Sequence, residues 1–177
     1  ELIEQHRPLE AIRRVGEWGC GTGRLLEPLR RFWPERVALA GTDLDPRCID
    51  WCRNHLPGID FQVNGLTPPL PFPDAHFDAL IARSVLTHLS GPQQEAWLRE
   101  LFRVLKPGGL LLFTTMGTAY RNQLIPAERA RFDAGQLVVR SEAHEGSKSF
   151  SAFHPPADVR VRLVPGRPIL VWQPPPC

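Results

Sequence analysis

The sequence predicts an α/β fold, a doubly wound and mostly parallel sheet with an irregular region of strands toward the C-terminal end. Short apolar runs alternate with helix-like segments up to residue 115, as in successive β–α–β units. A glycine-rich turn directly follows the first apolar run, and such turns join strand to helix in sheets of this kind. After Gly117 the alternation stops, so the parallel sheet is expected to end there.

The first half of the sheet is predicted from three short apolar runs and the helices between them. The expected strands are residues 13–18, 37–42 and 59–63. Residues 24–32 have apolar side chains at helical spacing. A second helix is expected to begin at Pro46, with Asp45 as its N-cap, and to end at Leu56 before Pro57-Gly58.

The second half follows a proline-rich loop at residues 66–74, which cannot form a ladder strand or a helix. Residues 77–82 and 110–115 are predicted strands, and residues 91–105 form the helix between them. Because helices separate successive strands, the strands are expected to run parallel. Beyond the sheet we expect one more helix and several extended segments, at residues 126–134, then 136–140, 149–153, 159–164 and 169–172.

Composition excludes several classes of partner. The formal charge is +2 and the basic residues are scattered, so nucleic acid is not indicated as a partner. The longest apolar stretch covers residues 110–113, far shorter than a membrane span, and the start does not resemble a signal peptide, so we expect a cytoplasmic protein. Cysteines at positions 20, 48, 52 and 177 lack zinc-site spacing, so no metal is predicted. The chain opens at Glu1, which leaves open that it is a fragment, and the oligomeric state also stays open.

The most informative segment is EWGCGTGR, residues 17–24, between a predicted strand and helix. Glycines at every second position let the backbone turn sharply and approach a ligand. Asp43 ends the second strand, 20 residues after Gly23, where a carboxylate can accept hydrogen bonds from both hydroxyls of a ribose. Helix capping, the alternative role for such an acid, fits Asp45 better.

Two kinds of nucleoside cofactor, a dinucleotide and S-adenosylmethionine, are the alternatives for this turn. Dinucleotide sites use GxGxxG and bring a pyrophosphate to the helix. Here the spacing is GxGxG, and Glu17 stands two residues before the first glycine. A carboxylate would repel a pyrophosphate but attract the ammonium and sulfonium of S-adenosylmethionine (SAM). Spacing and charge therefore both favour SAM over NAD.

Four segments in order resemble the motifs of class I SAM-dependent methyltransferases, in particular bacterial members of undefined substrate. They read VGEWGCGTGRLL, VALAGTDLDPRCIDWC, PLPFPDAHFDALIARSVLTHL and LRELFRVLKPGGLLLFTT, and the resemblance covers roughly residues 12–117. It implies a Rossmann-like fold and SAM as cofactor. Glu17 stands where the family usually has Asp, which moves the carboxylate by about one carbon–carbon bond. One domain is expected over residues 1–177, with a cofactor-binding core at 1–117 and acceptor-side and C-terminal strands at 118–177.

The resemblance also implies roles for individual residues. The glycine turn should line the methionine part of SAM with Gly19, Cys20, Gly21 and Gly23. Glu17 should approach the amino group of SAM, Asp43 should hold the ribose, and Leu44 should lie against the adenine. Near the adenine amino group we expect Asn64, or alternatively Gly65 or Leu66. Arg83 falls where the family's chain passes the methionine moiety.

The acceptor side carries no explicit motif. Methyl transfer needs a general base only when the acceptor must lose a proton, and the candidates are His154, His88 and Ser84. Residues 117–154 are expected to fold over the strand ends and to build an acceptor pocket from Leu124, Ile125, Phe132, Phe150 and Phe153. The predicted activity is methyl transfer from SAM to a small-molecule or glycan-type acceptor. A non-catalytic SAM-binding module and an NAD-dependent oxidoreductase are the alternatives.

Overall fold

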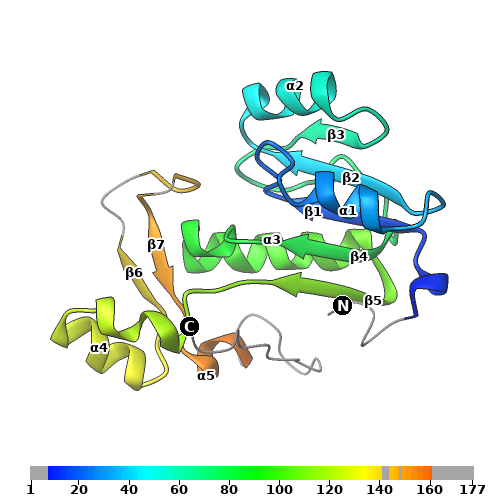
Figure 1. The fold of residues 1–177 in the computed structure, drawn as a ribbon. Helices are drawn as coiled ribbons and strands as arrows, with labels where there is room; N and C mark the ends of the chain where they lie inside the picture. Colours follow the sequence, from blue (N-terminus) through cyan, green and yellow to red (C-terminus); the bar gives the residue numbers. More distant parts are fainter. Residues whose placement is uncertain (1–7, 141–143, 148, 161–177) are drawn as a thin grey trace.

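The computed structural model describes residues 8–140, 144–147 and 149–160 and is built around a five-stranded parallel sheet (Figure 1). The strand order is β3-β2-β1-β4-β5, so the first strand lies in the centre. The strands are β1 (Arg14–Trp18), β2 (Ala38–Asp43), β3 (Asp60–Val63), β4 (Phe77–Ala82) and β5 (Leu105–Phe113). All four pairings are parallel, which confirms the predicted sheet. The chain changes direction across the sheet between β1 and β4, and ligands of such sheets bind outside the carboxyl ends at this point.

Helices cover both faces of the sheet, as a doubly wound fold requires. On one face α1 (Leu26–Phe32) and α2 (Pro46–His55) pack against β1 and β2 through Leu26, Ile49 and Cys52. On the other face α3 (Gly91–Val104) buries Trp97, Leu98 and Leu101 against Trp18 and Leu80. The short helix η1 (Leu9–Ala11) precedes β1. Along β1, β2, β4 and β5 apolar side chains alternate between the two clusters, so both faces of these strands pack into the apolar core.

Several boundaries differ from the sequence prediction by one or two residues, and the start of β5 differs by five. Strand β5 begins at Leu105 instead of residue 110, because Leu105 already pairs with Phe77, and the register shifts before Ala79 pairs with Leu110. The intervening Lys-Pro-Gly-Gly segment forms this irregularity, and turn residues there gave no strand signal. Helix α1 begins at Leu26 because the turn that follows Gly19 extends through Leu25.

The chain after the sheet forms a smaller layer beside the end of β5 (Figure 1). It contains η3 (Thr118–Gln123), α4 (Pro126–Asp133), the antiparallel pair β6 (Val138–Arg140) and β7 (Ser151–Phe153), and α5 (Pro156–Asp158). Its apolar cluster joins Leu124, Phe132, Val138 and Phe153 to Met116. The strand expected at residues 159–164 is wrong at its start, because Val159 and Arg160 are helical and the Val159 amide donates to the Pro155 carbonyl. The rest of that strand and the one expected at 169–172 lie outside the described residues.

An ionic cluster around the buried Glu100 fixes the proline-rich loop against α3. Glu100 accepts a hydrogen bond from the Leu70 amide at 2.7 Å and another from Arg103. Arg103 also donates to the Phe72 carbonyl at 2.9 Å and pairs with Asp74. The loop that leads from β3 to β4 is therefore held in place by charge-assisted bonds from the helix.

No helix in the described ranges has the length and apolar character that crossing a bilayer requires.

Candidate active site

The glycine turn leaves β1 at its carboxyl end and is tied to the neighbouring strand. The amides of Gly19 and Cys20 donate to the Thr42 carbonyl at 2.8 and 2.9 Å. Gly19 has φ +76°, and a Cβ atom there would overlap Cγ2 of Val85, so no side chain fits. At Gly21, with φ +54°, a Cβ atom would meet nothing within 4 Å. The turn is thus packed at Gly19 and open at Gly21, which is where a ligand can approach the backbone.

Asp43 lies directly beside this open position. Its Oδ2 accepts a hydrogen bond from the Gly21 amide at 2.7 Å, and its Oδ1 accepts one from the Asp45 amide at 2.9 Å. The carboxylate is only partly buried, and each oxygen has a second lone pair available to a ligand hydroxyl. The two backbone bonds therefore fix the carboxylate at the mouth of the turn.

Asp45 has the capping role predicted for it. Its Oδ1 accepts from the Arg47 amide at 2.9 Å at the start of α2. The Arg47 guanidinium also donates to Asp45, and these bonds lower the pKa of this carboxyl to about 2. The two nearby acids are thus separated by geometry, one facing the glycine turn and one capping a helix.

Glu17 is a buried acid in the strand just before the turn, with 4% of its surface exposed. Its Oε2 has no hydrogen-bond partner among the residues that the structure describes. Burial raises the pKa of Glu17 to about 8, an effect that the charge of Arg83 opposes and that of Asp43 reinforces. At neutral pH the free chain therefore holds this carboxyl largely protonated, and a cationic ligand group would favour its ionised form.

The residues predicted to contact adenine surround the space beyond Asp43. Leu44 and Leu66 are 48% and 42% exposed, a high value for apolar side chains. Asn64 is buried. Its backbone amide donates to the Asp43 carbonyl at 3.0 Å, and its side-chain Nδ2 donates to the Gly65 carbonyl at 2.7 Å. The Asn64 Oδ1 accepts no hydrogen bond from any described residue, so it is available to a ligand amino group.

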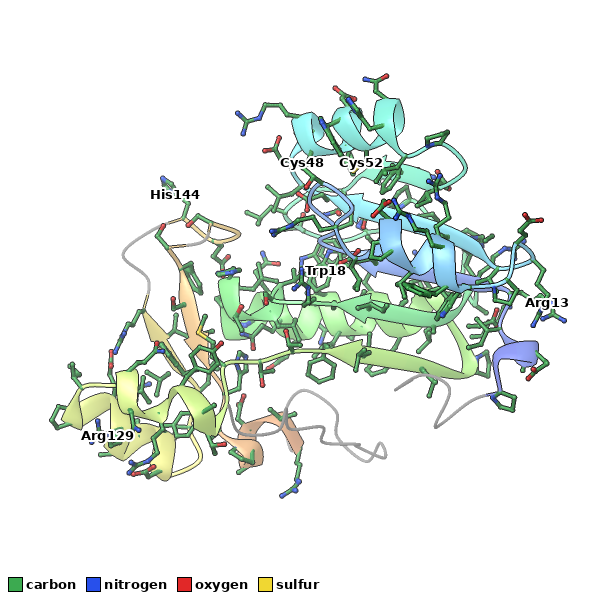
Figure 2. The ribbon with its side chains drawn as sticks, in the orientation of Figure 1. Arg13, Trp18, Cys48, Cys52, Arg129 and His144 are labelled. Atoms are coloured by element: carbon green, nitrogen blue, oxygen red, sulfur yellow. The ribbon has the colours of Figure 1, made fainter. Side chains whose placement is uncertain are left out.

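A turn between β6 and β7, residues 144–147, lies against both leucines. A Cβ atom on Gly146 would come within 2.9 Å of Leu66 Cδ1 and 3.3 Å of Leu44 Cδ2. The Gly146 amide donates to the His88 carbonyl at 2.8 Å, and the Ser90 amide donates to Glu145 Oε1 at 2.6 Å. Figure 2 shows His144, the first residue of this turn, at the outer end of the hairpin. Sequence reasoning missed this contact, because the local sequence resembles an exposed loop.

A cavity of about 350 Å³ lies where β4 and β5 end. Its lining comes from the segments after these two strands and from η3, and consists of Arg83, Ser84, Thr87, His88, Thr114, Thr115, Met116 and Tyr120. Ser84 has φ +58°, and its amide donates to Thr114 Oγ1 at 2.8 Å. Val85, the next residue, contacts Gly19, so the cavity adjoins the glycine turn.

The three candidate bases lie at different places relative to this cavity. Ser84 and His88 line it, and His88 Nδ1 lies 2.8 Å from the Phe150 carbonyl oxygen. His154 is 1% exposed and does not line the cavity. Its backbone amide donates to the carbonyl of Met116, a residue that does line the cavity. His154 thus sits behind the cavity wall.

None of the apolar residues predicted to form the acceptor pocket lines the cavity. Leu124, Phe132, Phe150 and Phe153 are buried, three of them in the cluster with Met116, and Ile125 is 59% exposed. Met116 and Tyr120 from the same part of the chain do line it. The position of Met116 just after a parallel strand was the signal that could have identified it.

Comparison with known proteins shows the family of this chain. A family model described as a methyltransferase domain matches residues 15–109. The chain is 40% identical over 135 residues to a fatty-acid O-methyltransferase of Mycolicibacterium smegmatis, covering 74% of this chain and 46% of that protein. It is 30% identical over 156 residues to a malonyl-[acyl-carrier protein] O-methyltransferase of Serratia marcescens, covering 88% and 53%. The chain thus spans about half the length of these curated relatives.

Solved structures share the fold. A SAM-dependent methyltransferase from Mesorhizobium loti superposes with a TM-score of 0.56 at 22% identity, covering 68% of this chain and 54% of that one. The SAM-bound amino pentose methyltransferase CalS10 from Micromonospora echinaspora gives a TM-score of 0.55 at 23% identity, covering 78% and 52%. At this identity the likeness concerns the fold alone.

Proposed function

The chain belongs to the class I family of SAM-dependent methyltransferases, and from this premise we propose that it transfers the methyl group of SAM to a small-molecule acceptor. The observation that carries the proposal is the grouping of Glu17, the open backbone at Gly21 and Asp43 at the ends of β1 and β2. A buried acid with an unsatisfied oxygen, an accessible turn and a fixed carboxylate fit the ammonium, the chain and the ribose of SAM respectively.

The proposed binding mode assigns a role to each residue predicted to bind the cofactor except Arg83, which lines the neighbouring cavity. Glu17 ionises and binds the ammonium, while Gly19, Cys20, Gly21 and Gly23 line the methionine part. Asp43 accepts hydrogen bonds from the ribose hydroxyls through its remaining lone pairs. Leu44 and Leu66 lie against the adenine ring, and Asn64 Oδ1 accepts from its amino group beside Gly65. This set does not suit NAD, because Glu17 would face a pyrophosphate.

Bound SAM supplies a methyl group on a positively charged sulfur, which is a good leaving group. The task of the protein is to align the acceptor with that methyl carbon and to exclude water. The cavity beside Val85 is the proposed acceptor site, because it adjoins the turn that faces the methionine part. For a hydroxyl acceptor, Ser84 or His88 is placed to contact it, whereas His154 could act only after the cavity wall moves.

The names of the relatives support an oxygen atom as the methyl acceptor. Two of them are O-methyltransferases, one named for fatty acids and one for malonyl-[acyl-carrier protein]. A third relative, 38% identical over 104 residues, is a trans-aconitate 2-methyltransferase of Methylobacterium nodulans. We therefore favour a small acidic metabolite or carrier-bound acyl group over a glycan-type acceptor.

A cytoplasmic location is also part of the proposal. None of the three cysteines in the described part of the chain forms a disulfide, which suits a reducing compartment.

The cofactor assignment is tested by thermal unfolding of the full chain with SAM, S-adenosylhomocysteine or NAD. A ligand that binds only the folded state raises the melting temperature, so we expect SAM and S-adenosylhomocysteine to raise it and NAD to leave it unchanged. Stabilisation by NAD alone would contradict the proposal. Turnover of labelled SAM with a mixture of small metabolites then separates an enzyme from a module that only binds the cofactor.

A further inference from the structure

We propose that the cavity after β4 and β5 binds an anion, and that Arg83 holds the carboxylate of the methyl acceptor so that the product is a methyl ester. This proposal rests on the proposed function and specifies its substrate class. The first evidence is the composition of the lining: among the residues that the structure describes, Arg83 is the only one of fixed charge there and none is acidic.

The remaining polar groups of the lining suit the same ligand. Five of the eight residues carry a hydroxyl group, namely Ser84, Thr87, Thr114, Thr115 and Tyr120. Hydroxyl groups can donate to carboxylate oxygens. Thr114 Oγ1 already accepts from the Ser84 amide, so its own proton is directed elsewhere. A cation surrounded by hydroxyl donors is an arrangement that recognises a carboxylate.

Arg83 has no hydrogen bond or ion pair to another residue in the described part of the chain, and it is exposed at the end of β4. Of the acids nearby, Glu17 lies in the field of Arg83 but is buried and holds its proton at neutral pH. Glu145, on the neighbouring turn, already accepts a hydrogen bond from the Ser90 amide. The charge of Arg83 therefore lacks a compensating partner that a bound carboxylate would supply.

The position of Arg83 also brings the carboxylate close to the reacting methyl group. Arg83 and Ser84 directly precede Val85, which contacts Gly19 of the glycine turn. In the reaction a carboxylate oxygen attacks the methyl carbon of SAM and forms a new O–C bond. The S–C bond breaks, its electron pair goes to sulfur, and S-adenosylhomocysteine leaves with the methyl ester as product.

No proton moves in this reaction, because a carboxylic acid is already ionised at neutral pH. A general base is therefore unnecessary. The proposal accordingly gives His88 a positioning role: its ring contacts the Phe150 carbonyl and its own carbonyl accepts from Gly146, so both groups anchor the β6–β7 hairpin. The buried His154, which does not line the cavity, then needs no catalytic role.

The test uses three probes that differ only in the head group, octanoate, octanol and octylamine. Each is titrated by calorimetry into the full chain saturated with S-adenosylhomocysteine, and each is then incubated with labelled SAM. We expect octanoate to bind about tenfold to a hundredfold more tightly than octanol, as charge-assisted hydrogen bonds imply, and to be the only probe that is methylated. Equal binding of octanoate and octanol, or methylation of the alcohol or amine, would overturn the proposal.

Variants of Arg83 distinguish the acceptor role from a role in holding the carboxylate of the cofactor. Arg83→Gln should weaken octanoate binding by about tenfold or more while SAM affinity changes by less than about twofold, and Arg83→Lys should restore part of the loss. Arg31→Gln on α1, an exposed site, is the matched control. Loss of SAM affinity with octanoate binding unchanged would overturn the assignment of Arg83. Failure of the wild-type chain to bind SAM would instead contradict the proposed function itself.

Discussion

Glu17 illustrates how a single buried carboxyl group links ligand binding to pH. Its pKa is raised to about 8, chiefly by burial, so the folded chain without ligand binds a proton there up to slightly alkaline pH. An ammonium group placed beside it would favour the ionised form and release that proton. The free energy of cofactor binding must then depend on pH through this residue.

We predict that SAM affinity increases between pH 6 and pH 8, because the proton held by Glu17 is displaced more easily as pH rises. Calorimetry in two buffers of different ionisation enthalpy should detect close to one proton released per SAM at pH 7. Glu17→Gln removes the titrating group and should bind SAM weakly at every pH in this range. A pH-independent affinity in the wild type, with no proton release, would contradict the role of Glu17.

The same residue predicts the pH dependence of stability without ligand. The folded state binds more protons at Glu17 than the unfolded state between about pH 4.5 and pH 8, so this contribution to the free energy of unfolding falls as pH rises. Glu17→Gln should therefore be more stable than the wild type at pH 8, by about 2–4 kcal/mol in urea unfolding. Near pH 4 the two proteins should be nearly equal. A variant less stable at pH 8 would show that Glu17 is ionised and paired in the free chain.

Asp43 and Asp45 allow a paired prediction from two acids separated by one residue. Asp43→Ala should weaken SAM binding by about 1–3 kcal/mol, because a fixed acceptor of charge-assisted bonds is lost. Asp45→Ala should leave SAM affinity nearly unchanged and lower stability by about 1 kcal/mol, because it removes the cap of α2. Calorimetry and urea unfolding of both variants check this. Equal losses of affinity would show that the ribose acid is wrongly assigned.

Single residues were predictable where their chemistry depends on local sequence. The glycine turn, Asp43 and the cap at Asp45 each occupy a position fixed by the strand or helix beside them. The cavity lining was not predictable in the same way. Met116 and Tyr120 reach the cavity through tertiary packing, while three of the apolar residues expected there, Leu124, Phe132 and Phe153, pack together as core. Apolar character marks burial equally well in a core and in a pocket.

At the scale of elements, the fold depends on how α3 holds the proline-rich loop. Glu100→Ala removes the acceptor of the Leu70 amide and the partner of Arg103. We expect a loss of about 1–3 kcal/mol in the free energy of unfolding, because a buried donor loses its bond. Arg99→Gln, on the exposed face of the same helix, should change stability by less than about 0.5 kcal/mol. Similar values for both variants would mean that the loop does not depend on this cluster.

Elements were predicted well where one pattern covers a whole segment. β4 and the start of α3 match their expected boundaries, because an apolar run and a proline in the first helical turn mark them clearly. The beginning of β5 and the helical start at Val159 were missed. Glycine and proline concealed a paired strand in the first case. In the second, β-branched valines favoured a strand that the preceding helical turn overrides.

At the scale of the whole molecule, the parallel sheet brings together residues far apart in sequence. Residues 17–23 form the glycine turn and its approach, and residues within 83–88 and 114–120 line the cavity. Because all five strands run parallel, their carboxyl ends share one edge, and the alternation of strands and helices was enough to predict this. The sequence did not reveal that residues 144–147 return to the same edge, because two short hydrogen-bonded contacts leave no periodic signal.

This returning turn has a kinetic consequence. It lies against Leu44 and Leu66, where the adenine ring is proposed to bind, so cofactor uptake should require the turn to move first. The observed association rate, followed by intrinsic tryptophan fluorescence in stopped flow, should then level off as SAM concentration rises. Glu145→Gln weakens the bond to the Ser90 amide and should raise that limiting rate, whereas Arg31→Gln should not. A rate that stays proportional to SAM concentration would mean that the cofactor enters past an immobile turn, and turnover would then not be limited by how quickly this hairpin releases its product.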